Sequence, residues 1–223
     1  MKAVKEFELE EAKKISVPLS DDTLISKEES LTDLKKYQSI VGILTYLATT
    51  TRPDILYSSN WLSRRTKCAT KKHLKLAKKC LIYLRDNRHL KLRLDLVKEK
   101  GNNITVFVDS SLGNEEERNS CYGFIIYLNR SPIHFKSKKL QMVNLSSTEA
   151  EYVAMATAVQ EVKWILNYMK ELNIQIDTID VFCDNQGAIR IARNLTTSGR
   201  TKHLDLKLQY VKQEIREDQR FQI

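Results

Sequence analysis

The sequence has few residues that interrupt regular structure and few that form cross-links. Its 223 residues include six glycines, three prolines and four cysteines. This scarcity of glycine and proline excludes a collagen-like or low-complexity chain. No apolar run approaches the roughly 18 residues of a transmembrane helix, and the charged N-terminus lacks the apolar core of a secretory signal. With 42% hydrophobic and 29% charged residues, the composition predicts a globular protein without membrane association.

The cysteines offer no paired metal or disulfide motif. Cys68, Cys80, Cys121 and Cys183 lie far apart, with no CxxC pair among them, so structural zinc is not expected. Free, mostly buried thiols are typical of a reducing, intracellular compartment. The sequence also lacks a GxSxG motif and a P-loop, so neither a serine-hydrolase nucleophile motif nor a nucleotide-binding phosphate loop is expected.

Charge is concentrated in one segment. Residues 51–100 hold 15 Lys and Arg against 4 Asp and Glu, whereas residues 101–223 hold 15 of each. Within a helix predicted from Thr70 to Asn87, the apolar positions recur on one stripe. Five lysines fall largely off that stripe, and such a face can neutralise phosphates: Lys71, Lys72, Lys75, Lys78 and Lys79. The alternative is a solvated helix face.

The first hundred residues are otherwise read as mainly helical. Helices are predicted for Lys2–Lys14, for residues 34–47 and for Asp54–Arg64, the last with Pro53 in its first turn. Alternation in Leu90–Val97 predicts a strand. Trp61 and Trp164 both lie in helical apolar patterns and are predicted to be core residues.

After residue 101 the pattern changes to that of an α/β domain. Strands are expected in ITVFVDS, CYGFIIYL, SPIHFKS and TIDVFCD, with a short extension in MVNL and a last strand opening at RFQI. A long helix is predicted for Ser147–Leu172, followed by helices in NQGAIRIARN and LDLKLQYVKQEIRED. This order predicts a mixed sheet with flanking helices.

Two of these strands end on an aspartate, Asp109 and Asp184. If the strands are adjacent and parallel, both carboxylates lie at the same edge of the sheet. Hard oxygen ligands grouped there attract Mg²⁺ or Mn²⁺. The alternative is a pair of capping or turn aspartates.

A glutamate near the start of the long helix completes the predicted metal site. Ser146 and Glu149 have capping-box spacing, which gives Glu149 a structural role. Glu151 lies about 200° around the helix from it and is free to point over the strand ends. Three carboxylates from strand, helix and strand suit phosphodiester hydrolysis by two metal ions.

Four strings, in order, resemble the C-terminal part of the Pol polyprotein of Ty1/copia-type retrotransposons: YQSIVGILTYLATTTRPDI, HFKSKKLQMVNLSSTEAEY, VFCDNQGAIRIA and RTKHLDLKLQYV. The resemblance implies a helical reverse-transcriptase thumb and connection segment over residues 1–100 and a ribonuclease-H-like domain over residues 101–223. It implies metal ligation by Asp109, Glu151 and Asp184, Mg²⁺ or Mn²⁺ as cofactor, and RNA–DNA hybrids and the rest of Pol as partners. The expected location is the cytoplasm, in a virus-like particle, or the nucleus.

The chain also departs from the family pattern. Leu112 and Gln209 stand where the family has Trp and His, and the paired aspartates of the YxDD polymerase motif are absent. The family's fourth carboxylate belongs to a segment expected after Ile223, so the domain is interpreted as C-terminally incomplete; Asp205 is a weaker substitute. An impaired nucleic-acid-binding remnant, or a structural fragment of the polymerase, is therefore the alternative. Three further residues are assigned to phosphate contact, or else to packing or solvation: Arg200, Lys202 and His203.

Overall fold

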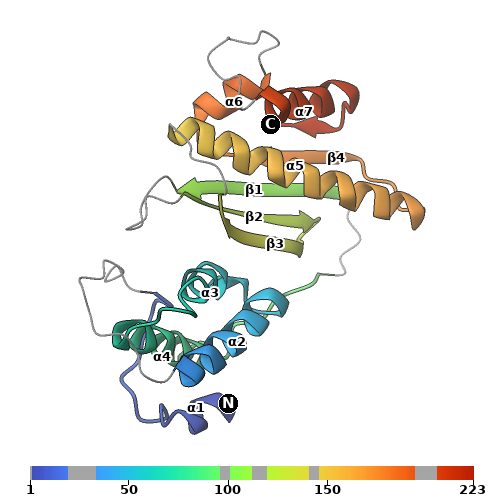
Figure 1. The fold of residues 1–223 in the computed structure, drawn as a ribbon. Coiled ribbons are helices and arrows are strands. Elements are labelled where there is room, and N and C mark those ends of the chain that lie inside the picture. The colour runs from blue at the N-terminus through green and yellow to red at the C-terminus, as the bar shows by residue number, and fades with distance from the viewer. Residues whose placement is uncertain (1, 20–33, 96–100, 112–119, 141–145, 194–204) are drawn as a thin grey trace. The chain divides into compact units, whose positions relative to one another are not determined.

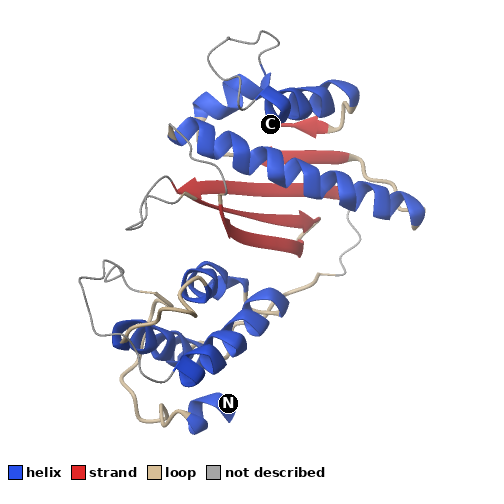
Figure 2. Ribbon diagram, in the orientation of Figure 1, coloured by secondary structure: helices blue, strands red, loops and turns tan. Residues whose placement is uncertain are grey.

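Figure 1 shows the computed structural model of the protein, which describes residues 2–19, 34–95, 101–111, 120–140, 146–193 and 205–223. The chain divides into two compact units, Met1–Leu92 and Arg93–Ile223. The first is helical and the second contains the sheet, as the colouring of Figure 2 makes clear. No described helix combines the length and apolar character needed to cross a membrane.

The first unit consists of helices around one apolar core. Its elements are α1 (Lys2–Glu6), α2 (Leu34–Thr50), the 3₁₀ turn η1 (Pro53–Ile55), α3 (Leu56–Ser63) and α4 (Lys71–Asp86). Pro53 opens η1, where its missing N–H costs no hydrogen bond. Tyr37, Leu44 and Trp61 are fully enclosed, and Trp61 is only 1% exposed, which confirms its predicted place in the core.

Helix α4 begins at a capping box built with a histidine. The Thr70 hydroxyl accepts a hydrogen bond from the His73 backbone N–H at 3.4 Å, and His73 Nδ1 accepts one from the Thr70 N–H at 2.9 Å. The imidazole therefore takes the place of the usual Glu or Gln. It is buried against Trp61, with ring centroids 5.6 Å apart, so the cap also joins α4 to the core.

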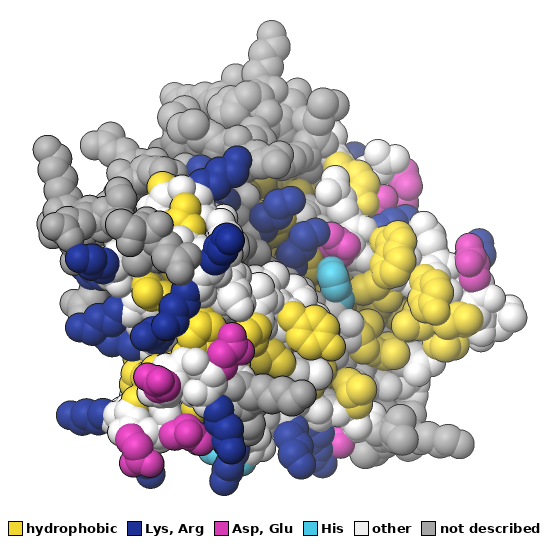
Figure 3. Space-filling model, turned by 60° about the horizontal axis from the view of Figure 1, so that its bottom comes forward, with side chains coloured by type: hydrophobic (Ala, Val, Ile, Leu, Met, Phe, Trp, Pro, Cys, Tyr) yellow, Lys and Arg dark blue, Asp and Glu magenta, His cyan; other side chains and the backbone are white. Residues whose placement is uncertain are grey.

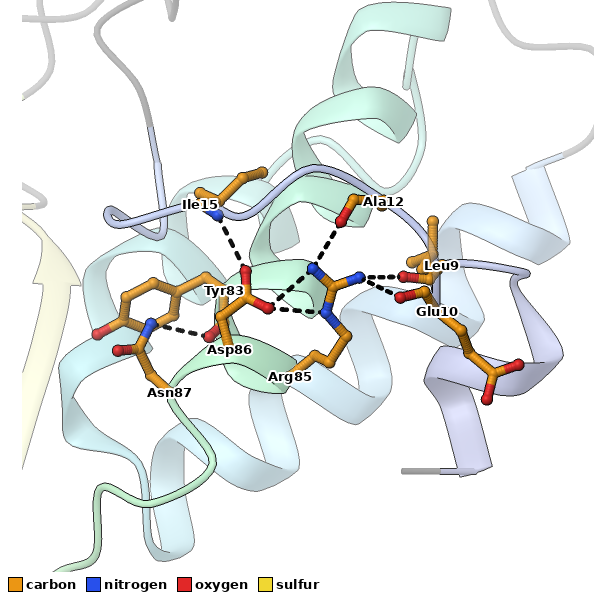
Figure 4. A network of polar contacts seen from close by, with 8 residues as sticks. All are labelled: Leu9, Glu10, Ala12, Ile15, Tyr83, Arg85, Asp86 and Asn87. Carbon is orange, nitrogen blue, oxygen red and sulfur yellow. Dashed lines mark hydrogen bonds and ion pairs between the residues drawn. The ribbon is translucent and has the colours of Figure 1, made fainter.

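The N-terminal segment is helical over a shorter stretch than predicted. Helix α1 ends at Glu6, not Lys14, and Glu8 has a positive φ of 55°. Arg85 at the end of α4 donates to the carbonyl oxygens of Leu9, Glu10 and Ala12, and Asp86 accepts from the Ile15 N–H at 2.9 Å (Figure 4). The backbone groups that a longer helix would have paired internally are thus bonded to α4 instead.

The strand predicted for Leu90–Val97 is wrong over its described part. Residues 90–95 form no strand, and residues 96 and 97 lie outside the described residues. Leu90 and Leu94 are exposed, Leu94 by 60%, so the alternating leucines have no face to bury. Strand formation depends on pairing with a neighbour, and the Asp95 N–H instead donates to the Ser131 side chain at 2.8 Å.

The second unit is built on a five-stranded mixed sheet in the order β3-β2-β1-β4-β5. Its strands are β1 (Asn103–Ser111), β2 (Cys121–Leu128), β3 (Ser131–Lys139), β4 (Thr178–Phe182) and β5 (Phe221–Gln222). β1, β2 and β3 pair antiparallel, whereas β1 with β4 and β4 with β5 pair parallel. The predicted mixed sheet, including a final strand near the last residue, is confirmed; the extension expected in MVNL lies outside the described residues.

Among the described residues of this unit, three helices accompany the sheet: α5 (Ser147–Glu171), α6 (Gln186–Arg193) and α7 (Asp205–Glu217). The long α5 runs across the central strands, with α6 and α7 beside it (Figure 1). Ile104, Val106 and Val108 alternate along β1 and are buried with the inner face of α5 in one core. Phe107 and Phe182 point to the other side of the sheet, where they are exposed and stacked at 5.2 Å.

The prediction that Trp164 is a core residue is wrong. Its side chain is 66% exposed and stacks on Tyr168 at 5.9 Å, along the outer side of α5. The buried positions of this part of the helix are Val162, Ile165 and Leu166, which leaves position 164 outside the inner stripe. Figure 3 shows that apolar side chains, in yellow, remain on the protein surface.

Candidate metal centre

The parallel pairing of β1 and β4 sets the position of the two predicted aspartates. Phe107 of β1 lies opposite Phe182 of β4, so Asp109 and Asp184 each stand two residues further along. Parallel strands present their carboxyl ends at one edge of the sheet. Both aspartates therefore lie at the same edge, and both are exposed there.

The turn after β4 is fixed against the start of α5. Asn185 caps α6, because its Oδ1 accepts the Ala188 N–H at 3.0 Å. Gly187 follows within the first turn, and a Cβ at this position would lie 3.0 Å from both Asn185 Oδ1 and Thr148 Oγ1. A glycine therefore lets the first turn of α6 approach the first turn of α5, which holds Asp184 near Glu151.

The helix α5 begins where the capping box predicts. The Ser146 hydroxyl accepts the Glu149 N–H at 3.2 Å, so Ser146 is the N-cap. One turn further, Glu151 is buried, with only 5% of its surface exposed. Its Oε1 accepts the Ser110 N–H at 3.0 Å, and the Cys183 thiol approaches its Oε2 at 3.7 Å. These contacts orient the carboxylate toward the edge where β1 and β4 end.

Glu151, Cys183 and Asp184 form a compact group of potential ligands. One ligand atom from each lies within 4.8 Å of the other two. Asp109, although it is equivalent to Asp184 in the pairing of β1 with β4, is not a member of this group. The structure thus brings Glu151 and Asp184 together and leaves Asp109 beside them on the adjoining strand.

The electrostatics of the group favour a cation. Burial raises the pKa of Glu151, and the nearby Asp109 and Asp184 charges raise it further, against the opposing effect of the Ser110 hydrogen bond. No lysine or arginine in the described parts of the chain forms an ion pair with Glu151. Buried carboxylates without a cationic partner, close to a second carboxylate, provide the oxygen donors that a divalent ion requires.

Sequence relatives identify the chain. The retrovirus-related Pol polyprotein from transposon RE1 of Arabidopsis thaliana is 34% identical over 210 residues, which cover 92% of this chain and 14% of the polyprotein. That from transposon TNT 1-94 of Nicotiana tabacum is 29% identical over 223 residues, covering 95% of this chain and 16% of the polyprotein. The chain belongs to the Pol polyproteins of copia-type retrotransposons. It spans only a small part of these relatives, and no family model matches it.

Comparison with solved structures gives matches at low identity and with TM-scores below 0.5. The compost-derived LC11-RNase H1 is 14% identical, with a TM-score of 0.40, and the match covers 54% of this chain and 81% of that enzyme. A foamy viral protease–reverse transcriptase in complex with an RNA/DNA hybrid is also 14% identical, with a TM-score of 0.46, covering 92% and 26% of the two chains. The predicted mixed sheet with flanking helices, preceded by a mainly helical segment, is confirmed.

The lysines of the predicted nucleic-acid-binding face lie on α4 of the Pol segment. None of the five is buried: Lys71 and Lys75 are exposed, and Lys72, Lys78 and Lys79 are half-buried. The inner side of α4 is formed by other residues, among them Leu76, Ala77, Cys80 and Leu81. Arg200, Lys202 and His203 lie outside the described residues.

Cys183 is the member of the group that sequence reasoning missed. By sequence alone it is one of four separate cysteines, and it directly precedes Asp184, just after β4. Burial raises the pKa of its thiol to about 11, and the Glu151 and Asp184 carboxylates act in the same direction. Its position next to a predicted ligand was the signal available in the sequence.

Proposed function

We propose that the unit Arg93–Ile223 is a ribonuclease H domain, which hydrolyses the RNA strand of RNA–DNA hybrids as part of a Pol polyprotein. The observation that carries this proposal is the approach of Glu151 and Asp184, at the sheet edge where Asp109 also lies. Membership of the Pol family supports it. Reverse transcription in the cytoplasm, within a virus-like particle, or in the nucleus is the proposed setting.

Asp109, Glu151 and Asp184 are the proposed ligands of two divalent ions, Mg²⁺ or Mn²⁺. When bound, such a pair of ions supplies an activated water and charge stabilisation for the leaving oxygen. The chain itself contributes orientation: the Ser110 N–H fixes one oxygen of Glu151, and Asn185 and Gly187 fix the turn that carries Asp184. Asp109, exposed at the edge of the same sheet, is the proposed further ligand of the site.

The test is Mg²⁺-dependent cleavage of a labelled RNA–DNA hybrid by the full chain. We expect Asp109→Asn, Glu151→Gln and Asp184→Asn each to reduce cleavage by more than the roughly 10–100-fold loss typical of outer-shell changes. The matched control is Glu171→Gln, which neutralises an exposed carboxylate at the other end of α5 and should leave the rate unchanged. Absence of cleavage by folded wild-type protein would exclude the proposal.

A second candidate function is binding of nucleic acid without hydrolysis. It is favoured by the position of Asp109 outside the compact ligand group and by the basic face of α4. Replacing exposed Lys71 and Lys75 by Glu should reduce the salt dependence of hybrid binding by about 0.9 per lost phosphate contact. Replacing exposed Lys5 and Lys13 instead is the matched control. Binding that does not respond to the Lys71 and Lys75 changes would remove α4 from the contact surface.

A further inference from the structure

The candidate metal centre contains a sulfur atom as well as oxygen atoms. We propose that Cys183 is a ligand in this centre for thiophilic divalent ions, such as Zn²⁺, Co²⁺ and Cd²⁺, which bind together with Glu151 and Asp184 and exclude the catalytic ions. The inference rests on the same site as the proposed function. It adds a second class of ion and a residue, Cys183, to which the ribonuclease H proposal gives no role.

The distances between the ligand atoms suit a small tetrahedral ion. For a Zn–S bond of about 2.3 Å and a Zn–O bond of about 2.1 Å, the tetrahedral angle places sulfur and oxygen roughly 3.6 Å apart. Cys183 Sγ and Glu151 Oε2 are 3.7 Å apart. An Asp184 oxygen lies within 4.8 Å of both, so a small side-chain rotation completes a three-ligand set with one position open to water.

The side chains that bear these atoms are held by different parts of the fold. Glu151 is buried and hydrogen-bonded to Ser110 of β1, and it cannot turn away without leaving that N–H unpaired. Cys183 is half-buried directly after β4, and Asp184 precedes the asparagine that caps α6. The set is therefore organised before any ion binds, which reduces the cost of binding.

The chemistry of the sulfur selects between classes of ion. Mg²⁺ requires oxygen ligands in near-octahedral geometry and leaves the thiol protonated, whereas thiolate is a preferred ligand of Zn²⁺ and Cd²⁺. When a thiophilic ion binds, the S–H bond breaks, the proton passes to solvent and a sulfur–metal bond forms; no oxidation takes place. Because Glu151 and Asp184 serve both classes, binding of one class excludes the other.

Cobalt titration of the full chain tests the sulfur contact without requiring catalysis. Co²⁺ added to wild-type protein should produce the near-ultraviolet thiolate-to-cobalt charge-transfer band, which should disappear in Cys183→Ser. The matched control is Cys68→Ser, in which an exposed cysteine of the helical unit is removed and the band should remain. The proposal is overturned if wild-type protein gives no band, or if the band survives in Cys183→Ser.

A second variant guards against loss of folding in Cys183→Ser. Asp184→Asn leaves the sulfur in place and changes an exposed side chain, and it should weaken Co²⁺ binding at least about tenfold. Unchanged Co²⁺ affinity in Asp184→Asn would contradict the shared ligand set. A cobalt band without Mg²⁺-dependent hydrolysis would reject the ribonuclease proposal alone, whereas hydrolysis without a band would reject the role of Cys183 alone.

Discussion

Asp54 in the helical unit and Glu151 in the sheet unit are both held by hydrogen bonds, but their partners differ in charge. Asp54 accepts two hydrogen bonds from Arg52, at 2.7 and 2.9 Å, and one from the Tyr83 hydroxyl at 3.0 Å. Burial alone would raise its pKa, but these partners outweigh burial and lower it. Glu151 accepts from a backbone N–H and approaches a thiol, and its pKa is raised.

This difference separates a carboxylate that stabilises the fold from one that is available to a cation. In the helical unit, Asp54 is paired with Arg52 and Asp86 with Arg85. In the sheet unit, Glu151 is left near further negative charge, which costs stability in the absence of a cation. A protein retains such an arrangement where function requires it.

The largest effect is expected on removing the Asp54 charge. Asp54→Asn leaves the buried guanidinium of Arg52, 8% exposed, without its ionic partner, and should destabilise the helical unit by about 2 kcal/mol. Urea unfolding followed by Trp61 fluorescence in a Trp164→Phe background measures this. Asp95→Asn, which breaks a pair with the 83% exposed Arg93 side chain, should change stability by less than about 0.5 kcal/mol.

The contribution of Asp54 also has a defined pH dependence. Because its folded pKa is lowered from 3.8, the stabilisation is fully present above the unfolded value and is lost as pH falls through the folded value. The difference in stability between wild type and Asp54→Asn should therefore shrink below about pH 4. A difference that stays constant into acid would show that the carboxylate charge is not responsible.

The next effect is stabilisation of the sheet unit by metal. At Mg²⁺ ten times its dissociation constant, linkage predicts a gain of about 1.4 kcal/mol. Hydrogen exchange of the β1 and β4 amides reports on this unit directly. The gain should disappear in Glu151→Gln and persist in Glu171→Gln. An equal gain in both variants would mean that Mg²⁺ acts elsewhere.

Without metal, Glu151→Gln should stabilise the protein by about 1 kcal/mol at neutral pH, opposite in sign to Asp54→Asn. Glutamine still accepts the Ser110 N–H but carries no buried charge. Since the folded pKa of Glu151 is raised above 4.5, the wild-type penalty is complete above the folded value and vanishes below the unfolded value. Stability curves of the two proteins should therefore converge in acid. Destabilisation at neutral pH would contradict the comparison.

The sequence was sufficient to predict those helices and strands whose local residue pattern is typical of one kind of secondary structure. The β-rich runs ITVFVDS and CYGFIIYL predicted β1 and β2, and the capping residue Ser146 located the start of α5. The sequence predicted that Asp109 and Asp184 share one edge of the sheet only if their two strands are adjacent and parallel. The structure shows that β1 and β4 are paired in this way.

The remaining features depend on tertiary contacts that no local pattern contains. Leu90–Val97 alternates but finds no partner strand over its described part, and residues 9–15 are held by Arg85 and Asp86 from about seventy positions away. Cys183 enters the candidate site because Glu151 arrives from α5, a contact across 32 positions. Sequence spacing gives the direction of a side chain within its element, but not which other element it meets.

The smallest change in stability is expected for replacing Trp164, the exposed one of the two tryptophans. Trp61 is enclosed in the helical unit, whereas Trp164 lies on the outside of the sheet unit, so Trp164→Ser should change stability by less than about 0.5 kcal/mol. Val162→Ala, two positions away and fully buried, should cost at least about 1 kcal/mol by leaving a cavity. Acrylamide quenching should be strong for Trp164 and weak for Trp61. A large loss of stability in Trp164→Ser would mean that the outer face of α5 is covered in solution, because an exposed side chain has little packing to lose.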